Sequence, residues 1–158
     1  SDKGTGDAAR IDIREVTIDG EPRGQLWGGG VHIQSAADGA TTRDVRIQGV
    51  TARHAVRGAI LIDRLRDQGA ISAITVTRVV SERACASGDC ADYDVSGATD
   101  VLLEDCRSDA SRGYGFRARD GARVAVVAGE VEGAGAGDHD GEAGSFTRLE
   151  INGQSLLP

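Results

Sequence analysis

Ile74-Thr75-Val76-Thr77-Arg78-Val79 is the stretch that decides the fold. Its apolar residues stand at the first, third and sixth positions, and two polar residues separate the third from the sixth. Alternation over the first three positions is typical of a short β-strand with one buried face. The two polar residues predict a corner, after which Val79 again points inward.

The same pattern recurs on both sides of this stretch. Further copies begin at Ile11, Val45, Val101, Val124 and Leu149, the last two in degraded form. The intervals between successive copies are 34, 29, 27, 23 and 25 residues. A second apolar pattern lies about midway between copies, at 30–33, 58–62, 93–95, 113–118 and, degenerate, 141–144. Repetition at this period is typical of a solenoid.

Each coil is expected to hold three short strands. The corner positions should stack along the solenoid about 4.8 Å apart, in the order Val16, Val50, Val79 and Cys106, and the degraded copy has Val131 as its corresponding residue. Cys106 is therefore expected to be a buried thiol. No segment keeps a helical period over ten residues. The sequence predicts an all-β, right-handed parallel β-helix of about five to six short coils over 11–158, after a poorly ordered segment at 1–10.

This repeat resembles that of the pectate-lyase-like superfamily over roughly residues 11–151. The resemblance implies a carbohydrate-related protein that binds a polysaccharide along the outer face of one stacked sheet, beside long loops. It leaves open whether the chain also cleaves or epimerises that polysaccharide, as a lyase, glycoside hydrolase or epimerase. It also implies an extracellular or cell-surface location.

Outward positions of the first strand are expected to form two columns. These are Asp12, Arg46, Thr75, Leu102, Ala125 and then Arg14, Gln48, Thr77, Glu104. On the resemblance, Arg46 is the candidate catalytic base or carboxylate clamp, with Glu104 and Asp12 orienting the substrate. Arg14, Gln48 and Thr77 are candidate substrate-binding residues.

The sequence lacks the carboxylate spacing and the motifs of known catalytic members of this superfamily. Asp12 and Glu104 lie three coils apart, roughly 14 Å, which is too far for a glycosidase pair. The signatures of polygalacturonases are absent. Trp27, the single Trp, is expected either to stack on a sugar ring or to plug the open end of the barrel.

The outer face of the second strand offers another set of polar residues. It comprises His32, Leu61, Asp94, Arg117 and then Gln34, Asp63, Ser96, Arg119. Asp94 and Arg117 are expected to form a surface ion pair of little energetic value. Asp63 and Asp94 are alternatively a diagonal carboxylate pair, although solvated charges are the favoured interpretation.

Two acidic loops are candidate calcium sites. Asp138 and Asp140 lie in a Gly-rich loop with His139 and Glu142, and Asp89, Asp92 and Asp94 alternate in another. Neither matches an EF-hand loop, and ordinary solvated turns are the alternative. Cys85 and Cys90 bracket a four-residue loop that a disulfide can close.

The overall charge limits the partners. A net charge of −7 argues against nucleic acid, whose phosphates select clustered cations, and no apolar run reaches membrane-spanning length. The alternative function is a non-catalytic β-solenoid scaffold or assembly module. The Gly/Asp/Ala-rich segment 1–10 cannot cap an apolar coil end, so a fragment of a longer protein or a homo-oligomer formed through coil ends is expected.

Overall fold

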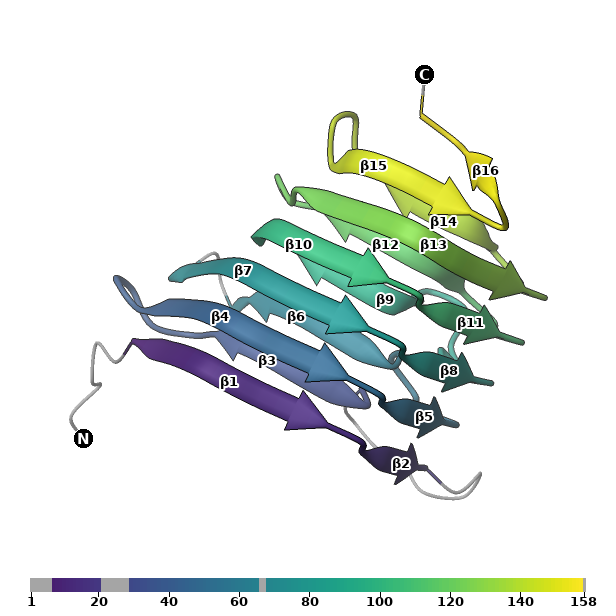
Figure 1. Cartoon of the computed structure of the whole chain (residues 1–158), viewed down its shortest axis with the longest axis horizontal. Helices are drawn as coiled ribbons and strands as arrows, with labels where there is room; N and C mark the ends of the chain where they lie inside the picture. Colours follow the sequence, from purple (N-terminus) through teal and green to yellow (C-terminus); the bar gives the residue numbers. More distant parts are fainter. Residues whose placement is uncertain (1–6, 21–28, 66–67, 158) are drawn as a thin grey trace.

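A computed structural model describes residues 7–20, 29–65 and 68–157. Within these ranges the protein is all β, without an α-helix, and its strands wind into a parallel β-solenoid of about four turns (Figure 1). The predicted fold class is therefore confirmed, but five to six coils is too many. The last copy of the repeat, which begins at Leu149, adds only a strand and its antiparallel terminal partner instead of a further coil. Trp27 lies outside the described residues.

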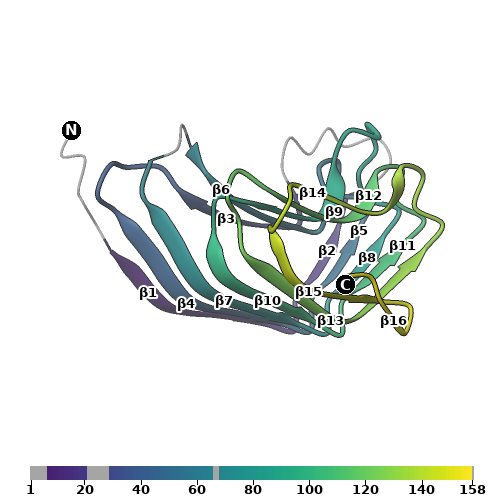
Figure 2. The ribbon, with the colours of Figure 1, turned by 90° about the horizontal axis from the view of Figure 1, so that it is seen from above.

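Three parallel sheets surround the core, and each complete coil gives one strand to each (Figure 2). Sheet A contains β1 (Ala8–Arg14), β4 (Thr41–Gln48), β7 (Ala70–Thr77), β10 (Thr99–Glu104), the first half of β13 (Val124–Glu132) and β15 (Phe146–Ile151). Sheet B contains β2 (Thr17–Asp19), β5 (Thr51–Arg53), β8 (Val80–Glu82), β11 (Arg107–Asp109) and the end of β13. Sheet C contains β3 (Val31–Ser35), β6 (Ile60–Arg64), β9 (Ala91–Ser96), β12 (Tyr114–Arg119) and β14 (Gly137–Gly141).

Some predicted boundaries differ from the observed ones. β1 begins at Ala8, inside the segment 1–10 that was predicted to be poorly ordered, and residues 1–6 lie outside the described residues. The last strand of sheet C is Gly137–Gly141, whereas the sequence pattern placed it at 141–144. The Gly-rich composition of this region hides the strand, because glycines give no inward-outward alternation.

The stacking predicted for the corner residues is confirmed over four coils. The strand registers on either side of the corner bring Val16, Val50, Val79 and Cys106 into line. Cys106 is fully buried and is not part of a disulfide.

The next position of this ladder is Gly129, so the expectation for Val131 is wrong. Arg107 pairs with Glu130, and Val131 instead follows Ser108 inside sheet B. A Cβ added to Gly129 would lie 2.8 Å from Val126 and 3.1 Å from the Phe116 ring. The aromatic ring takes the space that a larger side chain would need.

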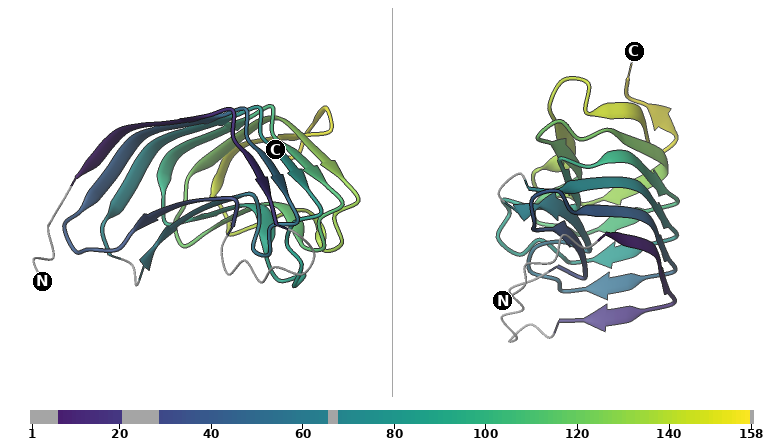
Figure 3. Two further views of the ribbon diagram at one scale, coloured as in Figure 1. Left: turned by 90° about the horizontal axis from the view of Figure 1, so that it is seen from below. Right: turned by 90° about the vertical axis from the view of Figure 1, so that its left-hand side faces the viewer.

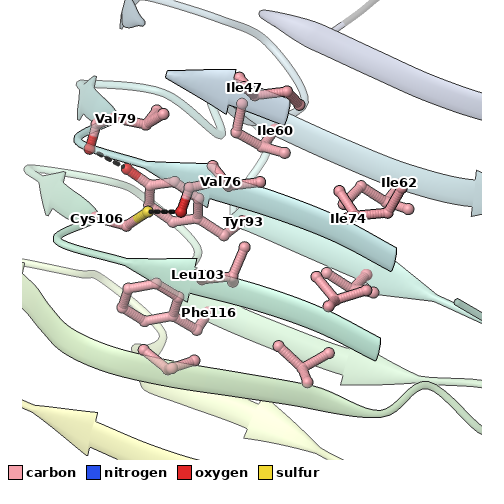
Figure 4. Close-up of a cluster of buried hydrophobic side chains, with 14 of the residues drawn as sticks. Ile47, Ile60, Ile62, Ile74, Val76, Val79, Tyr93, Leu103, Cys106 and Phe116 are labelled. Carbon is pink, nitrogen blue, oxygen red and sulfur yellow. Dashed lines mark hydrogen bonds between the residues drawn. The ribbon is translucent and has the colours of Figure 1, made fainter. Parts of the chain in front are cut away.

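The core contains one aromatic stack among the aliphatic ladders (Figure 4). The rings of Tyr93 and Phe116, on neighbouring strands of sheet C, lie 4.9 Å apart at 17°. The Tyr93 hydroxyl reaches the carbonyl oxygens of Val79 at 2.8 Å and Arg107 at 2.7 Å. The tyrosine therefore ties sheet C to sheet B across the interior.

The corner between sheets A and B is short and repeats in the first four coils. Only two residues separate the strands there, and one has a left-handed backbone: Glu15 (φ 50), Gly49 (φ 65), Arg78 (φ 51) and Asp105 (φ 49). Loops of variable length occur instead where the chain enters and leaves sheet C. Sheet C is thus the one sheet flanked by loops on both sides (Figure 3).

The two ends of the stack differ. At the C-terminal end, β16 (Gln154–Ser155) pairs with β15, and the Asn152 side chain hydrogen-bonds both the N–H and the carbonyl of Val131, at 3.0 Å each. At the other end, β1, β2 and β3 each pair on one side only within the described residues. The inward residues of β1 and β2, Ile11 and Ile13 among them, are only partly buried, whereas Val31 and Ile33 of β3 are buried.

Candidate functional site

The residues predicted for sheet A share one outer face. The register aligns Asp12, Arg46, Thr75, Leu102 and Ala125 in one column. It aligns Arg14, Gln48, Thr77 and Glu104 in the next. The alternation of the sequence therefore predicts this surface correctly, and its use by a ligand stays a prediction.

Side chains on this sheet A strip do not converge on a common point. Arg14 is hydrogen-bonded to Asp12 through two contacts of 2.7 and 2.5 Å, and this lowers the pKa of Asp12. Arg46 is exposed and Glu104 half-buried, and neither forms an ion pair among the described residues. A shallow depression of about 330 Å³ on this strip is lined by Asp100, Val101, Leu102, Arg123, Ala125 and Thr147.

Sheet C brings charged groups together more closely. Arg117 on β12 donates to Asp94 on β9 at 2.5 Å, and Arg119 reaches the same oxygen at 3.4 Å. The side chains of Asp94 and Arg117 are only 9% and 11% exposed. The predicted ion pair exists, but its description as a surface pair is wrong, since both groups are recessed. The hydrogen bond to Asp94 raises the pKa of Arg117.

A second polar group lies beside it on the same face. Asp63 Oδ1 lies 3.0 Å from Nε2 of His32 and accepts a 2.8 Å hydrogen bond from Gln34. Asp63 and Asp94 therefore each have their own partners, and the proposed diagonal carboxylate pair does not form. We call His32, Gln34, Asp63, Asp94, Arg117 and Arg119 the sheet C surface.

Loops explain why this outward face is recessed. Outward-pointing Leu61 is 5% exposed, and a Cβ added to Gly29 would lie 2.7 Å from its Cδ1. On the other side, Asp89 is close enough to Arg117 to contribute to its raised pKa. Asp89 belongs to the loop between Cys85 and Cys90, which are joined in a disulfide.

Two polar atoms of the sheet C surface have no hydrogen-bond partner among the described residues. They are Oδ1 of Asp94 and Nε of Arg117, both buried. Buried polar atoms are rarely left unpaired. The acceptor and the donor lie in the same ion pair, at the recessed base of the sheet C surface.

The acidic residues predicted to bind calcium do not gather around a common point in the described chain. Asp138 and Asp140 are exposed on β14, and Asp140 pairs in register with Arg117. Asp92 points to Ser108, whereas Asp94 points to Arg117. Across 7–20, 29–65 and 68–157, no three His, Cys, Asp or Glu side chains gather as metal ligands. Calcium binding at Asp138 and Asp140 stays a prediction.

Strand alternation in the sequence predicts that the sheet C residues lie on an outer face. It does not predict that some of them are buried there. The spacing of the repeats could have predicted the loops that cover this face. The corner after each first strand has a constant length, so the variation in repeat interval must come from loops around sheet C.

Comparison with protein-family profiles, curated proteins and solved structures finds no match. No helix of the described chain is long and apolar enough to span a membrane.

Proposed function

We propose that this solenoid binds a polysaccharide across the sheet C surface. The observation that supports this most is the recessed Asp94–Arg117 pair, flanked by the partly exposed side chains of His32, Asp63 and Arg119. Ligand sites combine shielding from water with a few placed polar groups. The resemblance to the pectate-lyase-like superfamily supports a carbohydrate ligand by analogy of fold alone.

The surface has the donor and acceptor pattern that a sugar needs. Carboxylates accept hydrogen bonds, guanidinium groups donate them, and a sugar hydroxyl does both. Asp63 and Arg119 stand in one column with one strand, β9, between them, and Leu61 lies between His32 and Asp94 in the adjacent column. Strand spacing of about 4.8 Å repeats this pattern along the solenoid, which suits an extended polymer.

Cleavage or epimerisation would need a base on this face. His32 is the best-placed residue, because Asp63 lies 3.0 Å from its Nε2 and orients the ring. A histidine oriented by a carboxylate can accept a proton from a bound substrate. Lyase and hydrolase assays on any bound polysaccharide test this, and a His32→Gln variant that retains full turnover would exclude it as the base.

The binding proposal is tested with an array of neutral and acidic oligosaccharides, followed by calorimetry. We expect His32→Ala/Arg119→Ala to weaken binding at least about tenfold, or about 1.4 kcal/mol. The matched variant Arg46→Ala/Thr77→Ala on sheet A should bind as the wild type does. If only the sheet A variant weakened binding, the ligand would bind the sheet A strip instead. The absence of any glycan binding would reject the proposal.

A second candidate function is an assembly module that associates through its first coil. The supporting observation is that Ile11, Ile13, Val16 and Ile18 are only partly buried there, while β1 and β2 pair on one side within the described residues. Unpaired strand edges favour association. Light scattering tests this: Ile13→Lys should convert an oligomer to a monomer, and a monomeric wild type would exclude the function.

A further inference from the structure

A small group of buried oxygen atoms lies inside the solenoid, between β9 and sheet B. Asp92 is 0% exposed, and Ser81, Ser108 and Ser111 are at most 2% exposed. Ser108 Oγ donates a 2.8 Å hydrogen bond to Oδ2 of Asp92. Ser81 pairs in register with Ser108, so the two hydroxyl groups stack on adjacent coils.

The surroundings of this group are apolar. Along the inward line of sheet B, Ala52 precedes Ser81 and Val131 follows Ser108. The next residue after Asp92 is Tyr93, which is fully buried in the core. The four residues therefore form a polar island, confined to two neighbouring coils.

The charge of Asp92 is not balanced by a side chain. No Arg, Lys or His of the described chain forms an ion pair with it, in contrast to Asp94 two residues later, which has Arg117 and Arg119. An ionised carboxylate without a counter-charge in a dry interior costs several kcal/mol. Burial accordingly raises the pKa of Asp92, and the hydrogen bond from Ser108 acts in the opposite direction.

Two oxygens of the group lack a hydrogen-bond partner among the described residues. They are Oδ1 of Asp92 and Oγ of Ser81, each on a fully buried residue. Two unpaired oxygens in one buried cluster call for a further partner, because unpaired buried polar groups are rare and costly.

We propose that Asp92, Ser81, Ser108 and Ser111 bind a monovalent alkali cation, Na⁺ in particular, inside the solenoid. Carboxylate and hydroxyl oxygens are hard ligands that suit such an ion. One carboxylate supplies one negative charge, which a monovalent ion neutralises and a divalent ion would exceed. Calcium normally collects six to eight oxygens, several from carboxylates. The ion would link the coil of Ser81 and Asp92 to the coil of Ser108 and Ser111.

The test is urea unfolding of protein refolded in NaCl or in tetramethylammonium chloride at equal ionic strength. Raising Na⁺ from about 10 to about 300 mM should lower the unfolding equilibrium constant about tenfold, because the ion binds only the folded state. That corresponds to a rise in Tm of about 3–6 °C for a chain of this size. Equal stability of the wild type in both salts would overturn the proposal.

Matched variants locate the effect. Asp92→Asn keeps the shape, removes the charge and should respond equally to both salts, whereas Asp89→Asn, exposed in the neighbouring loop, should keep the full Na⁺ response. An Asp92→Asn variant that responds like the wild type would also overturn the site. If Asp92→Asn does not fold, Ser108→Ala serves instead, since it deletes one ligand and must weaken the Na⁺ response.

Discussion

Left-handed backbone at non-glycine residues recurs at the corners of the coils. Ala128 has φ 50 at such a position in β13, and its side chain is exposed. A left-handed conformation costs an L-residue about 1–2 kcal/mol, and glycine avoids this cost. The corners therefore store strain that single substitutions can release.

Ala128→Gly is expected to raise the free energy of unfolding by about 0.5–1 kcal/mol, the released strain less the added backbone entropy of glycine. Ala125→Gly, in the same strand without a left-handed backbone, should lower it by a similar amount. Urea unfolding measures both. Equal destabilisation by the two substitutions would contradict the assigned corner.

Cys106 is expected to be chemically inert in the folded protein. Burial raises the pKa of its thiol to about 12, and only the thiolate reacts readily. At about pH 8, an aromatic disulfide reagent should label the single thiol only after urea is added, because unfolding must expose it first. Stoichiometric labelling of the native protein within minutes would show that the core ladder is open at this position.

At the scale of elements, strands of one sheet depend on interactions between neighbouring coils. The Asp94–Arg117 pair joins β9 to β12 in a recessed position. Removing one member of such a pair leaves the other charge buried, which is more costly than removing both.

Arg117→Met is therefore expected to lower the free energy of unfolding by about 2 kcal/mol, less than for an isolated buried pair because Arg119 still reaches Asp94 at 3.4 Å. The double variant Asp94→Asn/Arg117→Met should recover much of that loss, since no uncompensated charge remains. A double-mutant cycle by urea unfolding gives the coupling. Strict additivity of the two single substitutions would contradict a direct pair.

At the C-terminal end of sheet B, the Asn152 side chain makes the hydrogen bonds to Val131 that a further strand would make. Asn152→Gly keeps the left-handed backbone (φ 52) and removes both hydrogen bonds to Val131. We expect a loss of about 1–2 kcal/mol and faster hydrogen exchange of the Val131 amide. Unchanged exchange at Val131 would mean that Asn152 does not close this end.

At the scale of the whole molecule, the sequence predicts what faces inward and not what lies over the outer faces. Alternation around Val45, Ile74 and Val101 is enough to assign the strands, their parallel stacking and the outward columns. It cannot assign the recessed position of Asp94, which depends on loops from other coils. The placement of Gly129 also escaped prediction, because Phe116, 13 positions earlier in the sequence, fills its space.

The central claim is that the loop-flanked sheet C, rather than the regular sheet A, is the binding face. The most direct test is a set of ¹H–¹⁵N correlation spectra recorded while the best oligosaccharide from the array is added. We predict shifts concentrated at Gln34, Asp63, Ser96 and Arg119, on the outward face of sheet C. Shifts concentrated at Arg46, Thr75 and Leu102 on sheet A, or none at all, would contradict it.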